Sequence, residues 1–128
     1  MYLGLSVRDV RRSADWYRAL LDLRVERESF AEPESAAPWD EILLRDARSG
    51  LLLGLLKHRQ NPGEPFSEFR TGLDHVEFEV ETMEELDEWR QRLDHLGIPW
   101  TRNRSHLLTF RDPDNIQLEF FCPAHKRV

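Results

Sequence analysis

The sequence has a single cysteine, Cys122, so no disulfide within the chain can support the fold, and we expect a reducing compartment such as the cytoplasm. It has no apolar run of transmembrane length and no basic start followed by an apolar segment, so we expect neither a membrane span nor a signal peptide. The positive charges are scattered and the net charge is −6, which leaves no basic face for nucleic acid. These absences favour a small molecule as the partner.

The composition is typical of a small globular domain. Of the 128 residues, 40% are hydrophobic and 33% are charged. A chain of this length can bury a sizeable core but is short for two independent ones. We therefore predict a single domain over residues 1–128.

One stretch combines a strand pattern with side chains that can do chemistry. Between Leu73 and Val80, apolar residues alternate with polar ones, as in a strand with one buried face. The polar face carries an imidazole followed by two carboxylates, from His75, Glu77 and Glu79. Burying such groups costs free energy unless the face meets water, a metal ion or a ligand. This stretch is therefore our candidate functional site.

The same order of elements is predicted twice along the chain. A strand at Tyr2–Val7 precedes a helix that Asp9 can cap, and the strand at His75–Val80 precedes a helix that Thr82 and Glu85 can open with a capping box. Three strands follow each helix. The predicted ranges are helix Val10–Leu21 and strands Leu23–Phe30, Trp39–Arg45 and Leu51–Lys57, then a helix ending at Gly97 and strands Ile98–Asn103, His106–Phe110 and Ile116–Cys122.

The two halves also align residue by residue. Leu5, Val7, Trp16, Leu20, Leu23 and Val25 match Phe78, Val80, Trp89, Leu93, Leu96 and Ile98 at one constant offset. Two prolines favour a loop at Ala31–Pro38, and a segment rich in proline and glycine is predicted to connect the halves. We therefore divide the domain into module one (1–57), a crossover (58–72) and module two (73–128). Neither module can bury its sheet and close a cleft alone, whereas two together can.

Three motifs, taken in order, resemble those of a known family. They are Ser6-Val7-Arg8-Asp9 leading to Trp16-Tyr17, then Gly72-Leu73-Asp74-His75-Val76, and Phe110-Arg111-Asp112-Pro113-Asp114 before Gln117-Leu118-Glu119. With the repeat, they make the whole chain resemble the vicinal oxygen chelate superfamily, which includes glyoxalase I, the bleomycin-resistance proteins, extradiol dioxygenases and fosfomycin-modifying thiol transferases. The resemblance implies an α+β fold of two tandem βαβββ modules, with curled mixed sheets around a shared cleft and helices outside. It also implies a homodimer.

The resemblance points to particular site residues. In the metal-dependent members, the first and last strands of the modules supply ligands to a divalent metal such as zinc, nickel, manganese or iron. His75 and Glu119 match two of these positions, whereas Tyr2 and Gly54 stand at the first-module positions and leave the ligand set incomplete. Glu77 lies roughly 7 Å along the strand from His75 and could add a third oxygen only if the strand bends. The candidate metal ligands are His75 and Glu119, and the candidate catalytic residues are these two and Glu77.

Strand alternation and the aromatic content suggest further ligand-binding residues. The two indoles near strand starts could stack on a planar ligand. The candidates are Tyr2, Trp39, Trp100, Gln117 and Phe121. The turn at Asp112-Pro113-Asp114 is predicted to shape a hairpin and to take no part in chemistry.

Three functions stay open at this stage. The first is a metal-dependent lyase or dioxygenase, in which the metal acts as a Lewis acid on paired oxygens of a small substrate. The second is a metal-free protein resembling the bleomycin-resistance proteins, which would sequester a cationic or planar drug or metabolite in an acidic cleft. The third is a metal-independent lyase or isomerase with His75 or a glutamate as base. The missing first-module ligands argue against an ordinary glyoxalase.

Overall fold

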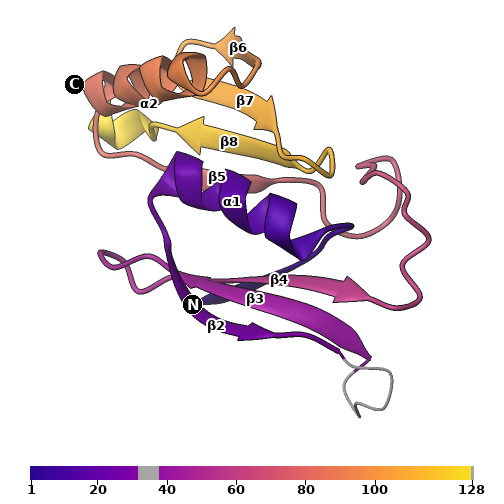
Figure 1. Cartoon of the computed structure of the whole chain (residues 1–128). Coiled ribbons are helices and arrows are strands. Elements are labelled where there is room, and N and C mark those ends of the chain that lie inside the picture. Colours follow the sequence, from indigo (N-terminus) through magenta and orange to yellow (C-terminus); the bar gives the residue numbers. More distant parts are fainter. Residues whose placement is uncertain (32–37, 128) are drawn as a thin grey trace. The chain divides into compact units, whose positions relative to one another are not determined.

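The computed structural model of the chain describes residues 1–31 and 38–127. It has an α+β fold of two βαβββ modules, each a mixed four-stranded sheet with one helix (Figure 1). The chain divides into two compact units, Met1–Glu64 and Pro65–Val128, which we call unit 1 and unit 2. The boundary between them falls inside the predicted crossover. The predicted fold class is confirmed, while the shared cleft stays a prediction.

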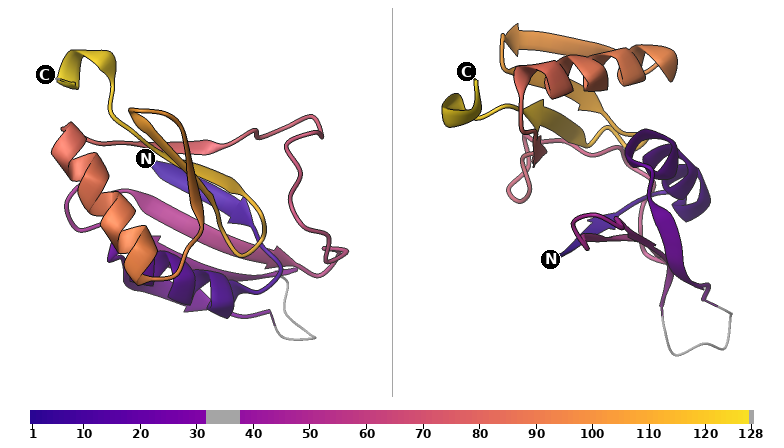
Figure 2. Two further views of the ribbon diagram at one scale, coloured as in Figure 1. Left: turned by 90° about the horizontal axis from the view of Figure 1, so that it is seen from above. Right: turned by 90° about the vertical axis from the view of Figure 1, so that its left-hand side faces the viewer.

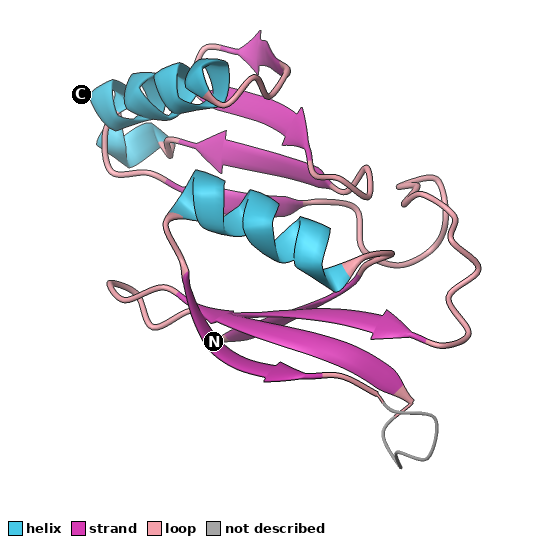
Figure 3. Cartoon of the chain, viewed as in Figure 1, coloured by secondary structure: helices cyan, strands magenta, loops and turns pink. Residues whose placement is uncertain are grey.

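Unit 1 contains one sheet covered on one face by a helix. Its strand order is β1-β4-β3-β2, with β1 and β4 parallel and the other neighbours antiparallel. The helix α1 packs on β3 and β4 (Figure 3). The elements are β1 (Tyr2–Ser6), α1 (Val10–Leu21), β2 (Arg24–Ser29), β3 (Trp39–Arg45) and β4 (Leu52–His58). The loop predicted at Ala31–Pro38 lies largely outside the described residues.

Unit 2 repeats this arrangement. Its strand order is β5-β8-β7-β6, again with one parallel pair, β5 and β8. The helix α2 lies along one face of the sheet and contacts β7 and β8 (Figure 2). The elements are β5 (Val76–Glu79), α2 (Met83–His95), β6 (Trp100–Arg104), β7 (Leu107–Arg111), β8 (Gln117–Phe121) and a short 3-10 helix (Ala124–Lys126). Predicted and observed strand ends differ by at most two residues, and those of β3 coincide.

Local hydrogen bonds explain where the helices begin and end. Asp9 accepts from the backbone amides of Arg11 and Arg12, both at 3.1 Å, and so caps α1. The Thr82 hydroxyl accepts from the Glu85 amide at 3.0 Å, as the capping box predicts. The returning carboxylate of Glu85, however, accepts from the amide of Glu81, one residue before the cap. Both predicted helix starts are confirmed, and the reciprocal bond is displaced by one residue.

The end of α2 requires a glycine. Gly97 has a φ of +69°, the left-handed conformation that other residues adopt at a cost. Its amide donates to the carbonyl of Asp94 at 3.1 Å, and the amide of Ile98 donates to the carbonyl of Leu93 at 2.9 Å. This is the Schellman pair of bonds, which satisfies carbonyls that the helix leaves open.

The two cores lie between each sheet and its helix, and leucine is the commonest of the large, fully buried residues in both. In unit 1 the fully buried side chains are mainly leucines, including Leu20, Leu44 and Leu55. In unit 2 the ring of Phe120 stacks on Trp89 at 4.3 Å and on Phe110 at 5.1 Å between centroids. Because these core residues alternate along the strands with residues of the opposite face, each sheet has one face free to carry a site. No helix within the described residues is long and apolar enough to cross a membrane.

Candidate functional site

Strand register brings three polar residues together on the face of unit 2 away from α2. The parallel pair β5–β8 places Glu77 opposite Glu119, and the antiparallel pair β7–β8 places Thr109 opposite Glu119. Directly opposed residues point to the same face of a sheet. The neighbours of Glu119 in β8, Leu118 and Phe120, are buried on the other face. Because side chains alternate along a strand, Glu119 lies on the opposite face from these core residues, together with Glu77 and Thr109.

Glu119 is a buried carboxylate held on both oxygens. Its side chain is only 8% exposed. Oε1 lies 3.0 Å from Nε2 of His75, and Oε2 accepts from the hydroxyl of Thr109 at 2.9 Å. A buried carboxylate without such partners would cost several kcal/mol. The two contacts stabilise its charge and fix its orientation.

His75 immediately precedes β5 and lies between two carboxylates. Its Nδ1 is 2.7 Å from Oδ1 of Asp74, and its Nε2 faces Glu119. A carboxylate oxygen can only accept, so this arrangement, in which both ring nitrogens face carboxylates, favours the protonated imidazole when no metal is bound. The hydrogen bond to Asp74 raises the pKa of His75, and the charges of Glu119, Asp74 and Glu77 raise it further against the opposing effect of burial.

The donor set fits a divalent metal ion. One ligand atom from each of His75, Glu77 and Glu119 can be chosen so that all lie within 4.8 Å of one another. The roughly 7 Å rise over two residues separates the backbone positions of His75 and Glu77, and their side-chain ligand atoms come closer together than that. An imidazole nitrogen with two carboxylate oxygens suits zinc, manganese, iron or nickel. Asp74 and Thr109 support the ligands from behind, as second partners of metal ligands generally do.

The equivalent face of unit 1 is built differently. Gly4 and Gly54 are directly opposed across β1 and β4, at the places that Glu77 and Glu119 hold in unit 2. The ring of Tyr2 lies over both glycines: a Cβ atom on Gly54 would collide with the phenol oxygen, and one on Gly4 would lie 3.2 Å from the ring. Tyr2 thus fills the space that a side chain at position 54 would need.

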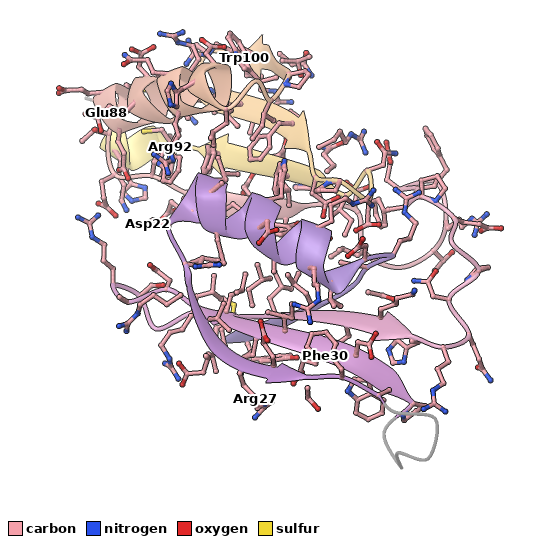
Figure 4. All side chains as sticks on the ribbon, viewed as in Figure 1. Asp22, Arg27, Phe30, Glu88, Arg92 and Trp100 are labelled. Atoms are coloured by element: carbon pink, nitrogen blue, oxygen red, sulfur yellow. The ribbon has the colours of Figure 1, made fainter. Side chains whose placement is uncertain are left out.

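The phenol of Tyr2 is held near an ion pair. Its oxygen lies 3.4 Å from Oε2 of Glu41, whose Oε1 accepts from Arg27 at 2.8 Å. Arg27 lies on β2 (Figure 4). Burial and the charge of Glu41 raise the pKa of Tyr2, so the group stays a neutral phenol at neutral pH. A neutral phenol is a poor metal ligand, which agrees with the incomplete ligand set predicted for the first module.

The other predicted ligand-binding residues lie in separate places. Trp39 is in unit 1, 37% exposed, with its ring 5.9 Å from that of His58. Phe121, at the end of β8, lies beside the ring of His106 and the guanidinium of Arg127. Trp100 lies near the end of α2 (Figure 4), where its indole nitrogen donates to Asp94 at 2.7 Å. Its opposed residue is Phe110, so Trp100 is on the helix side of the sheet, and it also borders the hollow beside Glu119.

A hollow of about 410 Å³ lies beside Glu119 in unit 2. Its polar lining comes from β6, β7 and β8 and includes Gln117, whose part in ligand binding stays a prediction. The polar side chains are those of Thr101, Asn103, Thr109, Arg111, Gln117 and Glu119. The volume is within the range of small-molecule sites.

Sequence reasoning missed three residues that shape this site. Thr109 was detectable, because the hairpin β7–β8 predicted from the turn at Asp112 places it opposite Glu119. The turn itself behaves as predicted, with Asp112 accepting from the amides of Asp114 and Ile116, both at 2.8 Å. Asp74 could be noticed only because it precedes His75. Glu68, which pairs at 3.0 Å with Arg111 in the lining of the hollow, lies in a segment without periodicity.

Comparisons with known proteins agree with this architecture. The family model described as the Glyoxalase/Bleomycin resistance protein/Dioxygenase superfamily matches residues 2–120. A glyoxylase/bleomycin resistance protein/dioxygenase domain from Frankia sp. EAN1pec is 31% identical, with 94% of each chain covered and a TM-score of 0.80.

Two fosfomycin resistance proteins share the fold. A mutant of FosX from Listeria monocytogenes, complexed with Mn(II) and 1S,2S-dihydroxypropylphosphonic acid, is 19% identical, with 98% of this chain and 93% of that chain covered and a TM-score of 0.72. FosX from Mesorhizobium loti is 19% identical, with 94% and 88% covered and a TM-score of 0.69. A search of curated proteins finds no match. By its family match over nearly the whole length, this chain belongs to the glyoxalase, bleomycin-resistance and dioxygenase superfamily, the vicinal oxygen chelate proteins.

Proposed function

We propose that this chain is a metal-dependent enzyme of the lyase or dioxygenase type, which binds a small oxygen-bearing substrate at His75, Glu77 and Glu119. The observation that carries the proposal is the convergence of these three donors within 4.8 Å on one sheet face. The hollow beside Glu119 offers room for the substrate. Three protein ligands leave positions open for water and substrate, as catalytic metal sites require.

The protein groups around the site would each have a distinct task. Asp74 holds the Nδ1 proton of His75 and so aims Nε2 at the site. Thr109 holds one oxygen of Glu119 and leaves the other directed at His75. Glu77 is the most exposed of the three donors, so it can also accept a proton from a bound substrate. When bound, a divalent metal ion would supply Lewis-acid polarisation of paired substrate oxygens.

Manganese is the first ion to test. The Listeria FosX, which shares the fold, is complexed with Mn(II). A site of one nitrogen and two carboxylate oxygens accepts manganese as well as zinc, nickel or iron. We also propose that the chain forms a homodimer, which analytical ultracentrifugation would test.

Metal content and metal titration test the proposal. Protein purified without chelator should hold metal in a one-to-one ratio, and Mn(II) should raise the melting temperature of the metal-free protein. We expect His75→Ala and Glu119→Gln to lower the affinity at least a hundredfold, since each removes a ligand. Glu79→Gln is the matched control, because Glu79 is on the same strand but pairs with Lys126 at 3.2 Å.

Absence of bound metal, together with no thermal shift from manganese, zinc, nickel or iron, would contradict the proposal. A metal-free binding protein is then the second candidate. Two observations favour it: Tyr2 fills the first-module position, and His75 and Glu119 already satisfy each other without an ion. No buried side-chain polar atom within the described residues lacks a hydrogen-bond partner. Such a protein would be expected to bind the same small molecule whether or not divalent ions are present.

A further inference from the structure

The hollow beside Glu119 contains one cationic side chain, that of Arg111. This residue ends β7 on the same face as Thr109, and its register partner is Gln117 on β8. An arginine in a pocket is the usual receptor for a carboxylate or phosphate group, because its planar fork matches two oxygens at once. Whether the hollow accepts an anion therefore depends on what occupies this guanidinium.

Four of the five N–H donors of the guanidinium already have acceptors in the protein. Its Nη2 donates to Oε1 of Glu68 and to Oε1 of Gln117, both at 3.0 Å. Its Nη1 donates to Oε2 of Glu68 and to the carbonyl of Asn115, both at 3.1 Å. Each terminal nitrogen carries two hydrogens, so all four have acceptors. The bidentate pair with Glu68 also neutralises the charge.

Glu68 is held in place by its surroundings and does not depend on Arg111 alone. It lies in the segment before β5, whose Phe66 amide donates to the carbonyl of Asp114 at 2.8 Å. The side-chain amide of Asn115 donates back to the carbonyl of Phe66 at 3.0 Å. These two bonds fasten the segment to the turn between β7 and β8. The carboxylate is consequently kept next to Arg111 at a high effective concentration.

We propose that Glu68 is a specificity-determining residue, which occupies Arg111 and so excludes anionic groups from the hollow. The hollow then selects an uncharged ligand that bears hydroxyl or amide groups. With Arg111 paired, the remaining polar lining consists of the hydroxyls of Thr101 and Thr109, the amides of Asn103 and Gln117, and the carboxylate of Glu119. That the hollow is the substrate site rests on the function proposed above.

Gln117 offers the ligand a hydrogen-bond donor. Its amide oxygen is used by Arg111, so its amide nitrogen is the end left to a ligand. This nitrogen can only donate, and a neutral carbonyl or hydroxyl oxygen is a suitable acceptor. In the metal-free protein, an anion in the hollow would meet the negative charge of Glu119, and the one cationic side chain of the lining is already paired with Glu68.

Freeing Arg111 tests the proposal. The variants Glu68→Gln and Glu68→Ala are titrated with inorganic phosphate at neutral pH, in buffer stripped of divalent ions, and the Nε–H signal of Arg111 is followed by NMR. Arg111→Gln identifies that signal by its loss. We expect phosphate to bind about tenfold more tightly to both variants than to the wild type, the size of one or two charge-assisted hydrogen bonds. The alanine variant should gain at least as much, because it leaves no side chain to reach the guanidinium.

Two controls separate pairing from net charge. Asp87→Asn removes the same charge from unit 2 beside a different arginine, Arg90 at 2.8 Å, and should leave phosphate binding unchanged. Adding Arg111→Gln to Glu68→Ala should abolish the gain. The proposal is overturned if both Glu68 variants keep their amide spectra and bind phosphate no better than the wild type. It is equally overturned if Asp87→Asn reproduces the gain.

The outcome is independent of the metal experiment. Phosphate binding at Arg111 is measured without metal, so a gain in a protein that binds no metal would overturn only the proposed metal-dependent function. Metal binding without a phosphate gain would overturn only the role assigned to Glu68.

Discussion

Unit 1 and unit 2 share their strand order and register, yet among the described residues only unit 2 carries a cluster of metal-type ligands. The difference lies in a few positions. Where unit 2 has Glu119 opposite Thr109, unit 1 has Gly54 opposite Leu43. The glycine is covered by Tyr2, whereas Glu119 faces His75. The same backbone therefore supports an open ligand site in one unit and a filled one in the other.

An arginine at the end of the third strand is common to both units. Arg45 is opposed by Leu52, as Arg111 is by Gln117, and each arginine holds a glutamate with two bonds. In unit 1 that glutamate is Glu26, on the neighbouring strand β2. In unit 2 it comes from the segment before β5, and this places an irregular segment of chain next to the site. The arginine thus occupies an equivalent position in both units, whereas in unit 2 its glutamate partner comes from the segment that connects the units.

The largest expected effect is on stability, and it tests whether the helix-facing sides of the two sheets contribute comparably to the free energy of unfolding. Leu55 and Phe120 hold matching positions in β4 and β8, and both are fully buried. We expect Phe120→Ala to destabilise the protein by about 4 kcal/mol and Leu55→Ala by about 3 kcal/mol, because each leaves a cavity. Denaturant unfolding measures both. A loss under 1 kcal/mol in either would mean that this core can collapse to fill the space.

A smaller effect tests the support behind Glu119. We expect Thr109→Val to lower metal affinity by about tenfold, because the carboxylate loses the donor that orients it. Calorimetric titration with Mn(II) measures the change. Leu43→Val alters the matching position of unit 1 and serves as the control, with no expected change in affinity. Unchanged affinity in Thr109→Val would show that His75 alone is enough to orient Glu119.

The filled face of unit 1 is tested by a double-mutant cycle. Gly54→Ala should displace the ring of Tyr2, which is half exposed and can swing outward, and so cost about 1 kcal/mol. In a Tyr2→Ala background the same change should be close to neutral. Thermal unfolding of the four proteins gives the coupling. Additive effects would contradict the contact between Tyr2 and Gly54.

The smallest effect concerns pH. The hydrogen bonds from Arg111 lower the pKa of Glu68 from 4.5 to about 2. A lowered pKa in the folded state adds stability above the unfolded value, and this is lost as the pH falls from about 4.5 towards 2. The melting temperature of the wild type should therefore exceed that of Glu68→Gln at pH 6, and the gap should close as the pH falls to 2. Glu26→Gln offers the comparison in unit 1, where the pKa of Glu26 is also lowered by Arg45. A gap that stays constant with pH would show that ionisation of Glu68 is not its source.

Much of the fold could be predicted from short-range patterns. The helix ends follow from Asp9, Thr82 and Gly97, whose side chains or conformational freedom act within a few residues. His75 and Glu119 were likewise identified as candidate site residues from the sequence, the first from strand alternation and the second from the family resemblance. The contacts of Trp100 were harder to predict, because its hydrogen bond to Asp94 depends on how α2 packs against the sheet.

By itself the sequence determined the repeat, the alternation of faces and the mismatch between Tyr2 with Gly54 and His75 with Glu119, because these depend on residue order alone. Tertiary structure decided which groups meet. Strand pairing places Glu77 opposite Glu119, the ligand atoms of both converge with that of His75, and Glu68 reaches Arg111 across 43 residues. Such contacts depend on register and on the path of the connection between the units, since hydrogen bonds and ion pairs act only over a few ångströms.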